Sequence, residues 1–115
     1  MTELPAGTYT DKTQSDYMVF MKNFIMSNLM MYDIMEKDET VVFKLMKALQ
    51  PVISIMEKMS EVEKLKNKEA TVDFVNQNAS KMQKMSQDLY KFMVGEAKAA
   101  GVPVVKEVPK PKDKN

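Results

Sequence analysis

The segment Phe20–Met35, which reads FMKNFIMSNLMMYDIM, constrains the fold of this chain more than any other feature. Its large apolar side chains recur at the three- and four-residue spacing that places them along a helix. Lys22, Asn23, Asn28 and Asp33 interrupt the run, whereas a helix that spans a bilayer needs about 20 apolar residues with few or no charges. The segment therefore predicts a long helix of a soluble protein and no transmembrane segment.

Apolar residues at helical spacing occur in four segments, which we predict to be helices at residues 15–37, 39–50, 51–67 and 71–100. Ser15 is a favourable N-cap for the first helix, and Thr71 is a favourable N-cap for the last. Gly101 suits the end of the last helix, because glycine commonly follows a helix in the left-handed conformation. These boundaries predict one helical domain over residues 15–101.

Pro51 separates the second predicted helix from the third. A proline inside a helix removes a hydrogen bond and clashes with the preceding turn, but it is well tolerated at the first position of a helix. The sequence thus leaves two alternatives open, a break at Pro51 and a continuous kinked helix. The predicted fold class is all-α, with three or four helices in an antiparallel bundle or hairpin.

The two ends of the chain differ in composition from the helical part. Residues 1–14 contain Pro5, Gly7 and several threonines, which disfavour helix and predict an extended arm. Residues 102–115 contain three prolines and four lysines, which predict a flexible or polyproline-like tail. The beginning of the chain lacks the basic and apolar regions of a signal peptide, so we expect a cytoplasmic or virion location.

Missing residue types limit the chemistry that this chain can perform. It has no His, Cys or Trp, and all 17 basic residues are lysine, against 16 acidic residues. A histidine base, a thiol nucleophile and a zinc site of Cys or His ligands are therefore excluded. Because the charges nearly cancel, no global field attracts nucleic acid or an anionic membrane. We expect no catalytic residue, no cofactor, no small-molecule substrate, and neither nucleic acid nor a membrane as partner.

Two groups of residues resemble metal ligands, and both have a simpler explanation. Thioether pairs, which suit Cu(I), occur at Met18/Met21, Met56/Met59 and Met82/Met85. Methionine at helical spacing more often serves packing. Carboxylates gather near the first helix junction at Asp33, Glu36, Asp38 and Glu39. Acidic residues favour helix starts, which accounts for the last two, so we predict no metal site.

The methionines support a functional hypothesis for the first helix. Methionine is flexible and polarisable, and it is common on surfaces that adapt to a partner. The helix has more apolar residues than a short core can cover, and Val19, Met26 and Met30 extend them onto its polar side. Such a belt indicates burial on two sides, once by the chain and once by another protein. The predicted partner interface consists of Phe20, Phe24, Met26, Met30, Met31, Ile34 and Met35; the alternative is a wholly internal helix.

Asn28 and Asn78 each lie among apolar residues of a predicted helix. A polar residue on an apolar seam can set the register or the number of partners, at a cost in stability. The alternative is that each amide hydrogen-bonds to nearby backbone. We predict both residues as candidates for register and specificity.

The leading functional hypothesis is a non-enzymatic structural or assembly protein. Its methionine-rich helix would associate with further copies of the chain or with a larger assembly, such as a virion. The alternative is a chaperone-like adaptor that holds an amphipathic client helix in a methionine-rich groove. No motif in the sequence identifies a known family.

Overall fold

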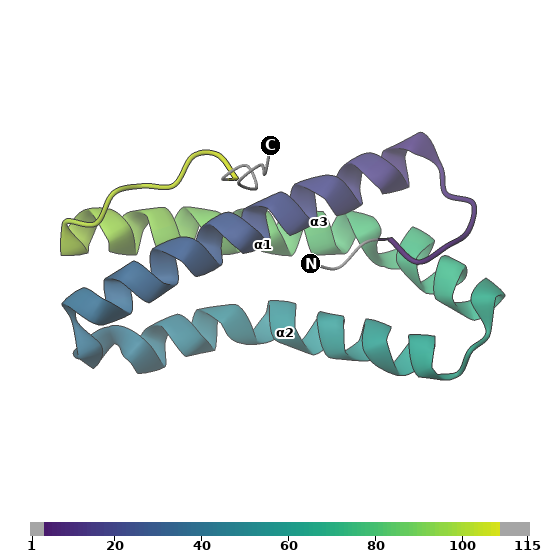
Figure 1. The fold of residues 1–115 in the computed structure, drawn as a ribbon, viewed down its shortest axis with the longest axis horizontal. Helices are drawn as coiled ribbons and strands as arrows, with labels where there is room; N and C mark the ends of the chain where they lie inside the picture. Colours follow the sequence, from purple (N-terminus) through teal and green to yellow (C-terminus); the bar gives the residue numbers. More distant parts are fainter. Residues whose placement is uncertain (1–3, 109–115) are drawn as a thin grey trace, which may run out of the picture.

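The computed structural model describes residues 4–108, and within them the chain is all-helical. Three α-helices follow one another, α1 (Asp11–Lys37), α2 (Val42–Lys64) and α3 (Lys68–Ala100), with a short 3-10 helix η1 (Glu39–Val41) between the first two. Successive helices run in opposite directions, and α1 and α2 both pack on α3 (Figure 1). The predicted all-α class is confirmed, with three helices packed together.

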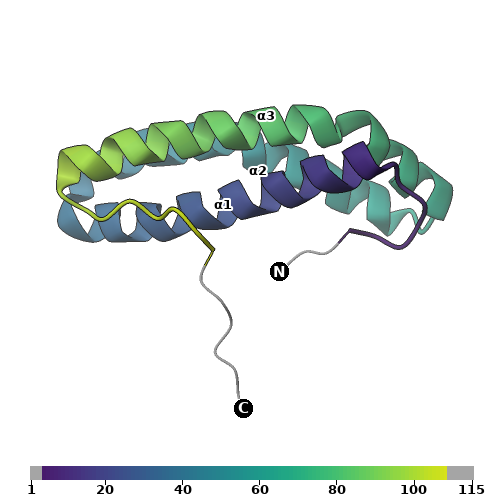
Figure 2. The ribbon, with the colours of Figure 1, turned by 90° about the horizontal axis from the view of Figure 1, so that it is seen from above.

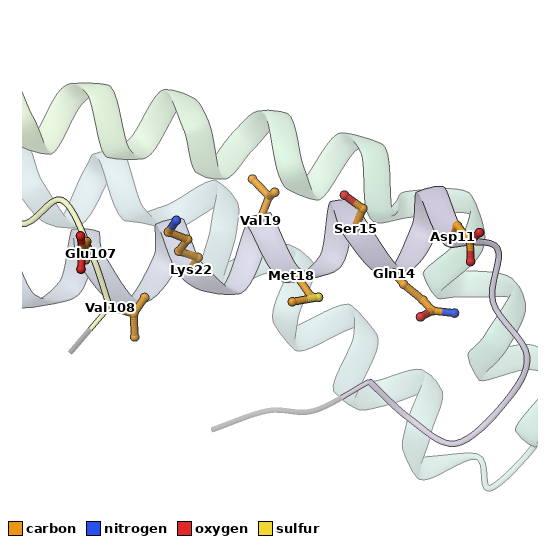
Figure 3. A pocket seen from close by; sticks show the side chains of 8 residues that line it. All are labelled: Asp11, Gln14, Ser15, Met18, Val19, Lys22, Glu107 and Val108. Atoms are coloured by element: carbon orange, nitrogen blue, oxygen red, sulfur yellow. The ribbon is translucent and has the colours of Figure 1, made fainter. Parts of the chain in front are cut away.

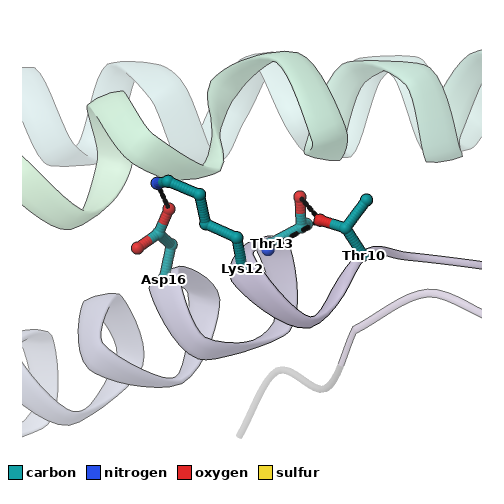
Figure 4. A network of polar contacts seen from close by, with 4 residues as sticks. All are labelled: Thr10, Lys12, Thr13 and Asp16. Carbon is teal, nitrogen blue, oxygen red and sulfur yellow. Dashed lines mark hydrogen bonds and ion pairs between the residues drawn. The ribbon is translucent and has the colours of Figure 1, made fainter.

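Helix α1 begins at Asp11, one turn before the predicted start at Ser15. Thr10 is the N-cap, and its Oγ1 accepts a hydrogen bond from the Thr13 backbone N–H at 3.0 Å (Figure 4). A threonine hydroxyl satisfies one of the N–H groups that a helix start leaves without a partner. Thr10, one of the threonines on which the predicted extended arm rested, is therefore the cap, and the helix begins four residues before Ser15.

Helix α2 continues through Pro51, so the two helices predicted at 39–50 and 51–67 are one. An internal proline costs about 3 kcal/mol. Burying one large aliphatic side chain contributes roughly 1.5–3 kcal/mol, so several of them outweigh that cost. The buried side chains of α2 keep their helical spacing across the proline: Leu45, Leu49, Val52, Ile55 and Met59. This stripe explains why α2 is continuous through Pro51 and why residues 4–108 form three α-helices instead of four.

Helix α3 begins at Lys68, one turn before the predicted cap at Thr71. The cap is Asn67, whose Oδ1 accepts a hydrogen bond from the Ala70 N–H at 3.1 Å. The helix is followed by Gly101, whose φ of 73° lies in the left-handed region that favours glycine. That turn reverses the chain and directs the following residues back along the helix.

Small polar side chains are buried in α1 and α3 among the large apolar ones. Ser27 of α1 and Ser86 of α3 are fully buried. Asn23 Nδ2 donates a hydrogen bond to Ser86 Oγ at 3.2 Å, which joins the two helices inside the core. On the other side of α3, Lys44 of α2 forms an ion pair with Glu96 at 2.9 Å. Since small side chains allow helix axes to approach closely, α1 and α3 form the main helix pair of the fold.

The N-terminal arm, residues 4–10, folds over the end of the molecule where α2 meets α3 (Figure 2). The Tyr9 hydroxyl donates a hydrogen bond to the Pro5 carbonyl at 2.7 Å, which closes the arm into a compact loop. Leu4 and Tyr9 pack against the core. Gly7 lies so close to α3 that a Cβ at this position would overlap Val72 Cγ2. The arm is thus packed on its own chain through a contact that requires glycine.

The C-terminal strap, defined here as residues 102–108, runs back beside α1 and α3 (Figure 2). Val102 is buried, and its N–H donates to the Ala97 carbonyl at 2.8 Å. The Tyr90 hydroxyl donates to the Val105 carbonyl at 2.8 Å. The first half of the tail predicted to be flexible therefore lies on the helices. The rest of that tail, 109–115, and the first residues of the arm, 1–3, lie outside the described residues.

Replacing Gly7 with alanine should weaken the docking of the arm, because the added Cβ overlaps Val72. We expect a loss of about 1–3 kcal/mol in the free energy of unfolding, measured by urea denaturation. Gly95→Ala is the matched control: nothing lies within 4 Å of its Cβ, and alanine favours a helix over glycine by about 1 kcal/mol. The control should therefore stabilise the protein. Equal stability of Gly7→Ala and the wild type would contradict this position of the arm.

Candidate docking surfaces

The predicted interface residues of α1 pack within the chain's own core. Phe24 and Met35 are half-buried and contact the core. The other five are buried: Phe20, Met26, Met30, Met31 and Ile34. In this conformation the seven residues pack within the chain, which is the arrangement expected of a wholly internal helix. An open contact surface must therefore be sought elsewhere on the molecule.

The orientation of α1 about its own axis explains why the predicted interface residues are buried. Asn23 and Ser27, which the sequence pattern assigns to the polar side, are buried. Met26 borders a groove between α1, α3 and the C-terminal strap. Two large side chains of the predicted apolar side are exposed instead, Leu29 and Tyr32. Because α1 carries apolar residues almost all the way round, their periodicity does not determine which side faces inward.

Asn28 and Asn78, the two asparagines predicted to set register, make no hydrogen bond between helices among those found in residues 4–108, whereas Asn23 does. Asn78 Nδ2 donates to the Phe74 carbonyl at 2.8 Å, one turn earlier in its own helix. This is the local backbone contact named as the alternative. Asn28 is half-buried on α1. The contact between helices is made by Asn23 and Ser86, and the sequence pattern missed it because it places Asn23 on the solvent-facing side.

Two buried hydroxyls find no hydrogen-bond partner among the described residues, those of Tyr17 and Ser27. Tyr17 is only 3% exposed, and this burial raises its pKa to about 12. The Glu63 carboxylate and Tyr9 are smaller causes of the same rise. The pKa of Tyr9 is also raised, first by burial and then by Glu63. Both phenols stay neutral near pH 7, so this cluster serves packing of the arm on α1 and α2.

The first candidate surface is an apolar patch at the end of the molecule where α1 turns into α2. We use the name junction patch for four large apolar side chains that are exposed on the second half of α1 and on the first turns of α2: Leu29, Tyr32, Phe43 and Met46. Phe43 is 74% exposed and Tyr32 is 63% exposed. Lys47 Nζ lies 5.6 Å from the centroid of the Phe43 ring. Large apolar side chains this open to water are candidates for contact with another protein.

The second candidate surface is a groove of about 390 Å³ between α1, α3 and the strap. We name it the lysine groove, because Lys22 of α1, Lys91 of α3 and Lys106 of the strap all line it. Its lining includes no carboxylate, and its other residues are Val19, Asn23, Met26, Gln87 and Tyr90. Within residues 4–108 none of the three lysines forms an ion pair. The groove thus combines positive charge with an apolar floor.

A wider hollow of about 810 Å³ adjoins the lysine groove and shares Val19 and Lys22 with it. Figure 3 shows this hollow along the first half of α1, with Met18 on one side and the end of the strap, Glu107 and Val108, on the other. It is open to solvent. The two together make a continuous recess beside α1.

Within residues 4–108, no three carboxylates lie close enough together to hold a metal ion. Asp38, one of the acidic residues considered for such a site, instead caps η1. Its Oδ1 accepts hydrogen bonds from the Thr40 N–H at 2.9 Å and the Thr40 hydroxyl at 2.6 Å. These bonds hold the pKa of Asp38 below its usual value, because they favour the ionised carboxylate. Of the helices in this part of the chain, none has both the length and the apolar character needed to cross a membrane.

A scan against protein-family models finds no match for this chain, and searches of curated proteins and of solved structures find none either. Any assignment of function therefore rests on the two surfaces and on their chemistry.

Truncation of Met30 tests whether the methionines of α1 are core. Met30 is 0% exposed, and replacing a buried methionine with alanine typically costs about 2–5 kcal/mol in the free energy of unfolding. Met18→Ala is the matched control on the same helix, because Met18 is 70% exposed and should lose less than about 0.5 kcal/mol. Equilibrium denaturation followed by circular dichroism measures both. Similar small losses would show that Met30 is not packed as described.

Replacing Tyr17 with phenylalanine tests the buried hydroxyl. Because its folded-state pKa is about 12, above the ordinary value of 10, its contribution to stability is present below pH 10 and is lost as the pH rises toward 12. The wild type should lose about 2 kcal/mol more than Tyr17→Phe over that range. Below pH 10 the variant should be as stable as the wild type or more so, since it removes an unsatisfied buried group. Tyr32→Phe, at an exposed tyrosine, should follow the wild-type pH profile.

Proposed function

We propose that this protein is a non-enzymatic assembly subunit that associates with further copies of itself through the junction patch. The observation that supports the proposal is the exposure of four large apolar side chains at one end of the molecule. Removing apolar surface from water contributes about 25 cal/mol per Å². The contact surface proposed here is therefore the outer side of α1 with the first turns of α2. The methionine-rich core of α1 supports that surface from inside.

The charges around the junction patch favour a second copy as its occupant. On one side of the turn α1 exposes Asp33, Glu36 and Lys37, and on the other side α2 exposes Lys44 and Lys47. In a two-fold symmetric contact, each surface meets the same surface of the partner in the opposite direction. The acidic residues of α1 in one copy then face the lysines of α2 in the other, which sets the orientation of the pair. A larger assembly would repeat this contact or combine it with another one.

A chaperone-like adaptor remains the second candidate, and the recess beside α1 is the observation that favours it. The part of α1 that lines the wider hollow of this recess, from Asp11 to Lys22, is about three turns long, and Met18 and Val19 are the apolar residues that it contributes to the lining (Figure 3). A client helix would lie there with its apolar side toward α1. Met18 is the methionine that lines this hollow, whereas Met30 and Met31 of the same helix are packed in the core. An adaptor of this kind is monomeric without its client.

Light scattering over a concentration series tests the proposed self-association. We expect the wild type to form a defined oligomer, and the double variant Tyr32→Ser/Phe43→Ser to require at least about tenfold higher concentration, because an anchor residue of an interface contributes more than about 1 kcal/mol. Circular dichroism should show unchanged helicity, because both side chains are exposed.

Leu65→Ser is the matched control for this experiment. Leu65 is 70% exposed, as open as the patch residues, but it lies at the far end of α2. This variant should assemble like the wild type. A wild type that stays monomeric at every concentration would overturn the proposal, as would equal dissociation of the Leu65→Ser protein. A monomer would also favour the adaptor.

A further inference from the structure

The strap shows that the surface between α1 and α3 can hold an extended chain. Val102 is buried there, and Val104 and Val105 pack against the core. The Tyr90 hydroxyl fixes the strap by donating to the Val105 carbonyl. Immediately after this hydrogen bond, Lys106 borders the lysine groove. The strap thus occupies part of the surface between α1 and α3, and the lysine groove lies beside it on the same surface. Residues 4–108 leave the groove empty.

The charges of the groove are arranged as a binding site for carboxylates. Lys22, Lys91 and Lys106 come from three different segments and meet around one groove without a carboxylate in its lining. The whole chain has a net charge of only +1, so a general excess of lysine does not explain this cluster. Like charges that share a site repel one another, and an anion between them relieves that repulsion. Glu107 lines the adjoining hollow together with Lys22, but it does not line the groove itself.

The floor of the groove selects for more than charge. Val19 and Met26 are the apolar residues of its lining, and Val19, which is half-buried, offers more surface to a ligand than Met26, which is buried. Methionine adapts its shape to different side chains. A ligand that matches the groove therefore carries carboxylates and apolar side chains together.

We propose that the lysine groove binds an extended acidic segment of a partner protein, with carboxylates on Lys22, Lys91 and Lys106 and apolar side chains on Val19 and Met26. The sequence that follows the strap, PKPKDKN, has three lysines and one aspartate, so its composition is not that of an acidic ligand. Nucleic acid fits less well, because base binding without sequence preference uses exposed aromatic faces, and Tyr90 is held by the strap. This site lies apart from the junction patch and is independent of self-association.

Fluorescence polarisation with designed peptides tests the proposal. The probe is a labelled eight-residue peptide of alternating glutamate and valine, compared with glutamate–serine and lysine–valine versions. We expect the glutamate–valine peptide to bind most tightly and the lysine–valine peptide not to bind. Lys22→Glu and Lys91→Glu should each weaken binding by about three- to tenfold, since each replaces an attraction by a repulsion. Glu107→Gln should strengthen binding slightly.

The matched control is Lys58→Glu, which changes the net charge equally at an exposed site on α2 outside the groove. It should bind the peptide like the wild type, and so should the Tyr32→Ser/Phe43→Ser protein, which separates this site from self-association. Failure of the glutamate–valine peptide to bind would overturn the proposal. Equal weakening by Lys58→Glu would do so as well, because it would show attraction by net charge alone. Tighter binding of an eight-nucleotide thymidine oligomer would assign the groove to nucleic acid instead.

Discussion

The close contact of α1 with α3 determines how the rest of the molecule is arranged. Ser27 and Ser86 are buried where the two helices meet, and Asn23 bonds across the seam. Because this side of α1 faces α3, Met26 borders the lysine groove and Leu29 is exposed to water. Turning α1 about its axis would change which residues face α3, the groove and water. The seam thus decides which apolar residues become core and which become surface.

Much of the fold is predictable from the sequence, because helical spacing of apolar residues is a local property. The all-α class follows from it, and Gly101 marks the end of α3 by its conformational freedom. The start of α1 is less predictable, since Thr10 and Ser15 are both acceptable caps and only packing selects between them. The continuity of α2 through Pro51 likewise depends on tertiary burial of the residues on both sides of the proline.

The candidate surfaces are harder to predict than the helices. The apolar residues of α1 extend onto its polar side, so the pattern does not fix which side faces inward: Met30, expected toward the polar side, is core, whereas Tyr32 is exposed. The lysine groove brings together Lys22, Lys91 and Lys106, which are far apart in the chain. Only the reversal at Gly101 brings the last of them beside the first two. Such a site depends on topology, which local patterns do not contain.

The uneven exposure of the methionines has a consequence for how the protein meets oxidants. Met18 and Met46 are open to solvent, whereas Met30, Met82 and Met93 are fully buried. Oxidation to the sulfoxide makes the side chain polar, which the fold tolerates on the surface but not in a packed core. The exposed thioethers should react at once without disturbing the helices, although a sulfoxide at Met46 makes the junction patch more polar. The buried ones react only when the helices separate, so their rate of sulfoxide formation reports how often the core opens.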